Sequence, residues 1–176
     1  MHSKPTILSV ETTAQSRLFE IQTVHLRFSN GVERHYERLQ SRSPEAVMVV
    51  AVDDGDLILI KEYGLGIEDY TLGFPKGLID EGETAEIAGN RELQEEAGYA
   101  AEKVSYLTVL SMNPGYSSMR THIVLAKGLY PSILPGDEPE PLEVVRWPIN
   151  DLEGLVANPA FNESRAVAAL FWVQRL

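Results

Sequence analysis

Three glutamates, Glu92, Glu95 and Glu96, are spaced so that their side chains meet if the segment around them is helical. At about 100° per residue, positions i, i+3 and i+4 share one helix face within an arc of roughly 100°. Like charges at this spacing repel each other and destabilise a helix by roughly a few tenths of a kcal/mol per pair. A bound cation removes that repulsion, and carboxylate oxygens in such an array suit Mg²⁺ or Mn²⁺. The spacing therefore predicts a metal site, and the alternative is a solvated helix face that binds nothing.

A longer pattern surrounds these glutamates. It reads Gly-x5-Glu-x7-Arg-Glu-U-x-Glu-Glu-x-Gly-U, where U is a bulky apolar residue, and by this pattern the chain resembles the Nudix hydrolases. The matching positions are Gly77, Glu83, Arg91, Glu92, Leu93, Glu95, Glu96, Gly98 and Tyr99. Given average residue frequencies, so many matches coincide by chance at fewer than roughly one in ten million starting points. Tyr99 is a mild departure, because Ile, Leu or Val is usual there.

The resemblance implies which groups bind metal. Glu92 and Glu96 would be the principal ligands, and the backbone carbonyl of Lys76 matches a position that ligates metal in relatives. Glu95 would complete the metal cluster or hold a metal-bound water as a catalytic residue. One or more Mg²⁺ ions, or Mn²⁺ in their place, would bridge the diphosphate of a substrate and activate water for attack on phosphorus. The reaction would need no covalent enzyme intermediate.

Four other positions of the pattern are implied to be structural. Gly77 keeps the loop before the helix free of a side chain near the metal site. Gly98 stands where a helix C-cap is expected. Glu83 and Arg91 would form an ion pair that orients the segment, and the alternative for this pair is an exposed salt bridge that contributes little to stability.

The attacking water also needs a base, or a group that orients it. An acidic loop at residues 135–141, rich in Gly and Pro, follows well after the metal-binding pattern. In ADP-ribose pyrophosphatases of the same family, acidic residues of a comparable loop complete the metal coordination and act as the base. By this resemblance Glu138 and Glu140 are nominated as catalytic residues. Both stay open, and the alternative is an ordinary acidic loop.

Similarity to one branch of the family, the bacterial hydrolases of ADP compounds, extends from Lys4 to about Arg175. The segments that carry it include KPTIL, FSNGV, GDEPEPL and FNESRAVAALF. This resemblance implies hydrolysis of ADP-ribose, NADH and diadenosine triphosphate, with AMP among the products. The binding partner would thus be a small nucleoside diphosphate derivative. The resemblance also implies a homodimer whose N-terminal sheet units help to build the partner's site.

Five residues outside the metal-binding pattern are candidates for substrate binding. Pro114 lies fifteen residues after Tyr99, a placement typical of the ADP-ribose branch. Gly115 and Tyr116 follow it and would form a loop near the substrate. Arg38 is a candidate for phosphate binding, and Tyr63 is a candidate for contact with adenine. For these last two a structural role is the alternative, since a lone tyrosine more often serves packing.

Some positions depart from the ADP-ribose branch. Residues 74–77, Phe-Pro-Lys-Gly, resemble the entry to the pattern in dinucleoside polyphosphate hydrolases. Thr71 and Gly64 stand where many ADP-ribose enzymes have glutamate and arginine. These departures favour a broader specificity for ADP compounds. The alternative enzyme is a hydrolase of dinucleoside polyphosphates or capped RNA ends, and the alternative from another class is a nucleotide sensor that does not cut, although such proteins typically lose these glutamates.

Composition limits the other classes of function. The chain has 176 residues, of which 44% are hydrophobic and 23% charged, as is typical of a globular domain with a small appendage. It has no cysteine, which excludes disulfides, cysteine–zinc sites and a thiol nucleophile. The net charge of −11 argues against nucleic acid as a partner. No apolar run reaches the roughly 20 residues of a membrane span and no secretory signal is evident, so we expect a cytoplasmic protein without membrane contact.

The metal-binding segment must be positioned by the elements around it. Residues 84–97 have helical composition and include all three glutamates. Apolar runs at residues 46–52 and 57–60 predict strands that are buried on both faces of a sheet. Residues 104–112 and 122–126 are expected to form further strands.

The ends of the chain complete the expected fold. Residues 18–28 and 32–39 alternate apolar and polar side chains around Asn30-Gly31, which predicts a hairpin. Asn150 and Asn162 are candidate N-caps for a short helix and for a C-terminal helix. The fold class predicted is α/β, a Nudix α/β/α sandwich with a mixed sheet. We expect an antiparallel β unit over residues 1–43 for dimerisation and substrate binding, and the Nudix hydrolase domain over residues 44–176.

Overall fold

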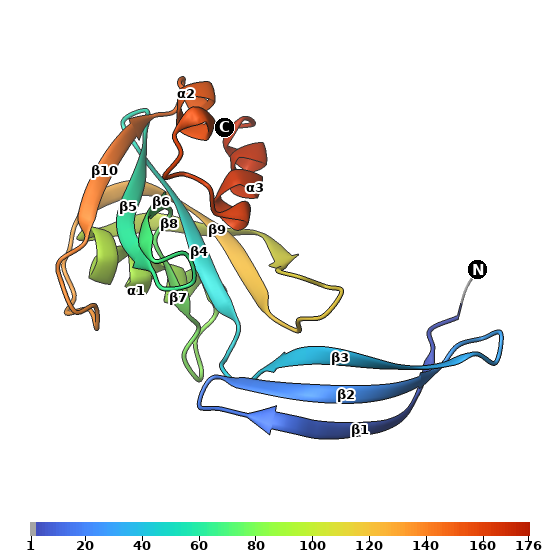
Figure 1. Cartoon of the computed structure of the whole chain (residues 1–176). Helices are drawn as coiled ribbons and strands as arrows, with labels where there is room; N and C mark the ends of the chain where they lie inside the picture. Colours follow the sequence, from blue (N-terminus) through green and yellow to red (C-terminus); the bar gives the residue numbers. More distant parts are fainter. Residues whose placement is uncertain (1–2) are drawn as a thin grey trace. The chain divides into compact units, whose positions relative to one another are not determined.

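The computed structural model describes residues 3–176 and divides them into two compact units (Figure 1). The N-terminal unit consists of residues 3–44 and a second segment, Ser111–Arg120. The sandwich unit consists of Glu45–Leu110 and Thr121–Leu176. The division expected from the sequence, at residue 43, did not include the second segment. No helix in the described part of the chain is long and apolar enough to span a membrane.

The N-terminal unit is a three-stranded antiparallel sheet in the order β1-β2-β3. Its strands are β1 (Thr6–Gln15), β2 (Phe19–Arg27) and β3 (Glu33–Ser41). The predicted hairpin is confirmed, and Gly31 at its turn has a φ of 82°, a value that glycine adopts readily. β1 was not predicted, since it lacks regular alternation and its register shifts twice against β2. Val24 is the single buried residue described in this unit.

The sandwich unit contains a seven-stranded mixed sheet. Its strands are β4 (Ala46–Asp53), β5 (Asp56–Gly64), β6 (Asp69–Gly73), β7 (Lys76–Leu78), β8 (Tyr99–Ser111), β9 (Arg120–Pro131) and β10 (Glu143–Pro148). The order is β10-β5-β4-β9-β8, with β6 paired to β5 and β7 to β4. β4 runs parallel to β9 and antiparallel to β5, so the sheet is mixed, as predicted. The sequence missed β6, β7 and β10, which are only five, three and six residues long.

Helices cover both faces of this sheet (Figure 1). They are α1 (Ala85–Ala97), α2 (Leu152–Ala157) and α3 (Ser164–Val173). Successive side chains of a strand point to opposite faces, so Val47 and Val49 of β4 pack in the cluster that contains Leu93 of α1. Met48 of the same strand packs in the other cluster, which contains Leu170 of α3. The prediction that this strand is buried on both faces, and the α/β/α architecture, are therefore confirmed.

The helix that carries the glutamates begins and ends as its sequence indicates. The hydroxyl of Thr84, its N-cap, accepts a hydrogen bond of 3.3 Å from the backbone N–H of Ile87. Gly98 at the C-cap has a φ of 74°, and its N–H donates to the carbonyl of Leu93. Both ends of α1 are thus defined by local interactions.

The N-caps of the two other helices are not the residues expected. Asp151, rather than Asn150, caps α2, and Glu163, rather than Asn162, caps α3. Each helix begins one residue later than predicted, because several adjacent polar residues can accept the same hydrogen bonds and packing of the helix on the sheet chooses among them.

Candidate active site

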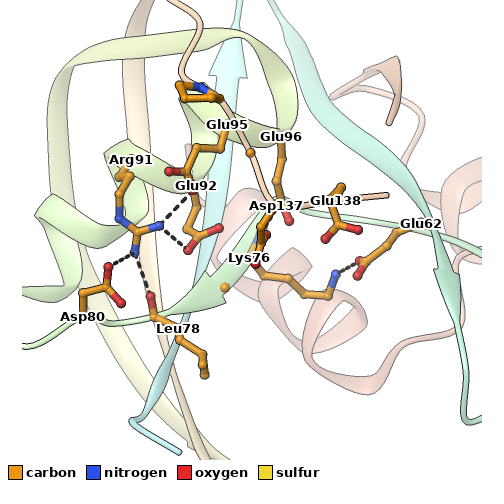
Figure 2. Close-up of a pocket in the computed structure, with 13 residues that line it drawn as sticks. Glu62, Lys76, Leu78, Asp80, Arg91, Glu92, Glu95, Glu96, Asp137 and Glu138 are labelled. Atoms are coloured by element: carbon orange, nitrogen blue, oxygen red, sulfur yellow. Dashed lines mark hydrogen bonds and ion pairs between the residues drawn. The ribbon is translucent and has the colours of Figure 1, made fainter. Parts of the chain in front are cut away.

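A pocket of about 540 Å³ lies beside α1, entirely within the sandwich unit (Figure 2). Five segments contribute to it: α1, β5, β7, the loop between β7 and α1, and the loop before β10. Its lining residues are Glu62, Lys76, Gly77, Leu78, Asp80, Arg91, Glu92, Glu95, Glu96, Pro135, Gly136, Asp137 and Glu138. Seven of these are acidic and two are basic. A pocket with this excess of negative charge binds an anionic substrate only together with cations.

The three glutamates of α1 all face this pocket, as their spacing predicts. Glu92 is the most enclosed of them, with only 7% of its surface exposed. Burial raises the pKa of Glu92, and burial raises the pKa of Glu96 to about 8. Glu96 also accepts a hydrogen bond of 2.8 Å from the backbone N–H of Lys76. Removal from water therefore makes ionisation of these carboxyls costly, and the nearby cations Arg91 and Lys76 offset only part of that cost.

Arg91 holds one side of the pocket together. Its guanidinium donates to both oxygens of Glu83, at 3.0 and 2.9 Å, which lowers the pKa of that carboxyl. It also donates to Glu92 at 2.7 Å and to Glu95 at 2.9 Å. A fifth hydrogen bond of 2.8 Å reaches the carbonyl of Leu78. The pair with Glu83 is bidentate and mostly shielded from solvent, so it is not the weak surface salt bridge that was the alternative.

Gly77 provides the space that this arrangement requires. A Cβ atom at this position would overlap the carboxylate of Glu92. Any larger residue would therefore displace Glu92 or the strand that carries Gly77. The backbone of Gly77 is not in the left-handed region, so space rather than conformational freedom explains the glycine.

The donor set fits a hard divalent cation, because the pocket offers only carboxylate and carbonyl oxygens in a partly buried setting. Glu92, Glu95 and Glu96 are the candidate ligands that one element, α1, supplies. Within residues 3–176, no three acidic or histidine side chains are arranged closely enough to hold an ion as they stand. Glu92 and Glu95 accept hydrogen bonds from Arg91 instead. To bind an ion, the side chains of both glutamates would have to turn away from Arg91.

The acidic loop brings one of its two nominated glutamates to the pocket. Glu138 lines the pocket, and its pKa is raised by burial and then by the negative charges of Glu62 and Asp137. Glu140 does not line it, and its carboxylate accepts a hydrogen bond from the hydroxyl of Tyr70. Geometry thus separates two residues that the sequence left equivalent.

Four of the five candidate substrate contacts gather in the N-terminal unit. There they line a second pocket, of about 400 Å³, and are Arg38, Pro114, Gly115 and Tyr116. Arg38 donates a hydrogen bond of 2.7 Å to the side chain of Gln22, which holds the guanidinium at this pocket. Tyr63 lies instead on β5 of the sandwich unit, where its ring packs edge-on against Tyr70 at 5.5 Å.

Comparison with protein families agrees with the geometry of the acidic pocket. The model of the NUDIX domain matches residues 42–171. The chain belongs to the Nudix hydrolase family. A second model, described as the NudE-type Nudix hydrolase N-terminal domain, matches residues 5–38.

This Nudix hydrolase has similar relatives along nearly its whole length. It is 55% identical over 171 residues to ADP compounds hydrolase NudE of Escherichia coli (strain K12), covering 97% of this chain and 92% of the relative. It is 30% identical over 176 residues to an ADP-ribose pyrophosphatase of Bacillus subtilis (strain 168), covering 95% and 94%. A crystal structure of an ADP compounds hydrolase superposes with a TM-score of 0.92 at 54% identity, covering 98% of this chain and 94% of the other.

Three acidic residues of the Nudix pocket were not foreseen. They are Glu62 on β5, Asp80 after β7 and Asp137 in the acidic loop. Asp137 could have been nominated from its neighbour Glu138. Asp80 lies within the metal-binding pattern, between Gly77 and Glu83, and could have been nominated from that position. Nothing in the sequence near Glu62 points to the pocket, because only strand pairing brings β5 to the side of α1.

Proposed function

We propose that this Nudix hydrolase cleaves the pyrophosphate bond of ADP compounds such as ADP-ribose, NADH and diadenosine triphosphate, giving AMP and X-phosphate. The observation that carries this proposal is the pocket in which the three glutamates of α1 meet Glu138. The substrate class is supported by the 55% identity to ADP compounds hydrolase NudE of E. coli (strain K12). These nucleotides are cytoplasmic metabolites, and we place the reaction in that compartment.

The proposed cofactor is Mg²⁺, with Mn²⁺ as a substitute. The residues that would hold it are Glu92, Glu95 and Glu96, with the backbone carbonyl of Lys76. All four residues line the pocket and offer the hard oxygen atoms that these ions prefer. The cation supplies positive charge that stabilises the phosphate oxygens in the transition state and makes a nearby water more acidic.

Glu138 is the proposed base. Its carboxylate lies in the pocket, and burial raises its pKa, which makes it a better proton acceptor than an exposed glutamate. It takes a proton from the attacking water, whose oxygen forms a bond to phosphorus. The bond from phosphorus to the bridging oxygen then breaks, and that oxygen leaves with the electron pair on the second phosphate. No group of the chain becomes covalently modified.

Glu140 and Tyr70 are proposed to position the base. The hydroxyl of Tyr70 on β6 donates to Glu140, two residues after Glu138. This contact ties the acidic loop to the sheet of the sandwich unit. We therefore assign Glu140 to holding the loop and not to proton transfer.

The second pocket is proposed to bind the nucleoside part of the substrate. Arg38 offers a guanidinium and Tyr116 an aromatic ring that is 57% exposed, groups suited to phosphate and to adenine. Pro114 and Gly115 shape the loop that carries Tyr116. Tyr63, on another unit and packed on Tyr70, is more consistent with the structural alternative.

The N-terminal unit is also the proposed dimerisation element. The described residues of the three-stranded sheet include one that is buried, so the apolar side chains of the sheet find little cover within their own unit. Apolar side chains of β1 and β2 stay exposed, including Ile7 at 55%, Val10 at 45% and Phe19 at 41%. A second copy of the chain would cover such a surface, and we propose a homodimer on this ground and on the family resemblance.

The test is a product analysis by chromatography in Mg²⁺, with ADP-ribose, NADH, diadenosine triphosphate and diadenosine tetraphosphate offered side by side. Release of AMP from the first three at comparable rates is expected. A strong preference for the tetraphosphate would replace the substrate class by dinucleoside polyphosphates, which the Phe-Pro-Lys-Gly segment at residues 74–77 favours. Intact substrate after prolonged incubation, despite measurable binding, would replace the enzyme by a sensor.

A further inference from the structure

Two cationic side chains, Arg91 and Lys76, line the acidic pocket. They differ in how many of their N–H donors are already hydrogen-bonded to other residues of the chain. Arg91 makes five hydrogen bonds to four residues of its own chain, which equals the number of N–H donors on a guanidinium. The ammonium of Lys76 is paired with the carboxylate of Glu62 alone among the interactions described. Arg91 thus has no donor left for a substrate, while Lys76 has two.

Lys76 is also placed where a substrate phosphate can reach it. Its side chain is 23% exposed and that of Glu62 is 28% exposed, so both border the open volume of the pocket. Figure 2 shows the Lys76 side chain extending to Glu62, with the carboxylate of Glu138 beside it. The pKa of Glu138 is raised by burial, by Glu62 and by Asp137, and the positive charge of Lys76 lowers it by a smaller amount. The ammonium therefore lies on the side of the pocket that holds the proposed base.

The ion pair between Lys76 and Glu62 is not required to hold the two strands. β5 and β7 are each hydrogen-bonded to β4 along their backbones. The lysine–glutamate pair consists of one hydrogen bond and lacks the bidentate geometry of the pair between Arg91 and Glu83. A lysine is in addition a flexible point charge, and a lysine is a common ligand of phosphate groups.

We propose that the ammonium of Lys76 is a ligand of the substrate's phosphate chain. Glu62 is a positioning residue, which holds the lysine at the pocket until a phosphate oxygen replaces its carboxylate. This inference rests on the proposed function and adds a specificity residue to it. It assigns a role to the lysine of the Phe-Pro-Lys-Gly segment, whose side chain has no part in the metal site.

The test measures binding of α,β-methylene-ADP, which carries an uncleavable diphosphate, to the full chain by calorimetry at saturating Mg²⁺. Lys76→Met keeps an unbranched side chain up to the Cε position, removes the ammonium and leaves the backbone N–H bonded to Glu96, and we expect binding about tenfold weaker. Lys76→Arg retains the charge and is expected to bind within about threefold of the wild type. The matched control is Lys61→Met on β5, whose ammonium lies outside the pocket near Glu143 and whose loss leaves binding unchanged.

Glu62→Gln distinguishes a phosphate ligand from a structural pair. Without the carboxylate the lysine is free to bind phosphate, so we expect Glu62→Gln to bind the analogue about threefold more tightly, the opposite of Lys76→Met. In the double variant, binding should equal that of Lys76→Met alone, since Glu62 acts through the lysine. For ADP-ribose hydrolysis, Lys76→Met should raise KM more than it lowers kcat.

The outcomes separate this inference from the proposed function. Equal binding by wild type and Lys76→Met, or equal weakening by Lys76→Met and Glu62→Gln, overturns the role of Lys76 while ADP-ribose hydrolysis by the wild type still supports the proposed function. A wild type that neither binds the analogue nor cleaves ADP-ribose overturns both. Opposite effects of the two substitutions, with unchanged thermal unfolding, support the phosphate ligand.

Discussion

The two units of this Nudix hydrolase each contain a pocket, but they are built in opposite ways. The sandwich unit encloses its sheet between two buried clusters, and its pocket of about 540 Å³ is lined mainly by carboxylates. The N-terminal unit has one buried residue among those described, Val24, and its pocket of about 400 Å³ combines apolar and aromatic side chains with Arg38, one glutamate and two serines. Catalytic groups must be held in a narrow geometry, which rigid elements such as those of the sandwich unit provide. Binding of a flat nucleoside, the role proposed for the N-terminal pocket, needs less precise positioning.

The two pockets should differ in which kinetic constant a substitution changes. Substitutions of the pocket carboxylates that are proposed to hold the metal or to act as the base should lower kcat, because these groups act on the reacting phosphate and the attacking water. Substitutions in the N-terminal pocket should act on KM, because they remove binding that is equal in ground and transition states. A variant of the N-terminal unit that lowers kcat without changing KM would contradict the assignment of this pocket to substrate binding.

The largest expected effect is that of Glu96→Gln in the acidic pocket. The substitution keeps the size of the side chain and removes one charge from the proposed metal ligands, so kcat for ADP-ribose should fall by about a thousandfold or more. The measurement is steady-state release of AMP at saturating Mg²⁺. Glu86→Gln, on the same helix but outside the pocket, is the matched control and should keep normal turnover. Near-normal turnover of Glu96→Gln would remove Glu96 from the site.

The second largest effect is expected in the acidic loop, where substitution of its two glutamates should lower kcat to different extents. Glu138→Gln should lower kcat by about a hundredfold, because it removes the proposed base. Glu140→Gln should lower kcat by less than about tenfold, and Tyr70→Phe should match it, since both break one positioning hydrogen bond. Rates of AMP release from the three variants check this order. If Glu140→Gln were the more damaging, the base would be Glu140 and the loop would move during turnover.

A smaller effect is expected in the N-terminal unit. Arg38→Ala should raise KM for ADP-ribose by about tenfold while kcat stays within about twofold, because a charged binding contact is lost. Arg34→Ala is the matched control, since Arg34 lies on the same strand but outside the pocket. A mixture of the Arg38→Ala and Glu96→Gln proteins tests whether Arg38 and Glu96 of one site come from different subunits. Partial recovery of activity in the mixture would show that a site draws residues from two subunits, and unchanged activity would place each site within one chain.

The smallest expected effect is on the stability of EDTA-treated protein. Burial raises the pKa of Glu96 to about 8 from an ordinary value of 4.5. Between these pH values the folded protein holds a proton that the unfolded chain has lost, so the free energy of unfolding falls as pH rises toward about 8. Glutamine does not titrate, and the variant should gain roughly 1 kcal/mol over the wild type between about pH 5 and about pH 9, a figure discounted because the carboxylate partly faces solvent. Thermal unfolding curves at both pH values measure the gap, and a gap independent of pH would contradict the raised pKa.

Much of the sandwich unit could be predicted from the sequence because its signals are local. The helix face of three glutamates depends only on the rotation per residue, and the cap at Gly98 depends on one left-handed backbone conformation. The dense apolar run of β4 predicts burial on both faces in the same way. Each of these features depends on residues within a few positions of one another.

Contacts between distant segments were decided by the tertiary structure alone. Strand pairing carries Glu62 of β5 to the side of α1, and the path of the acidic loop brings Glu138 into the pocket while Glu140 meets Tyr70. The segment 111–120 joins the N-terminal unit although most of the chain around it belongs to the sandwich. Residue types and spacing predict a metal site because its three glutamates lie on one helix. Which further side chains reach the same pocket depends on how the sheet and loops fold back on that helix, and no local pattern records it.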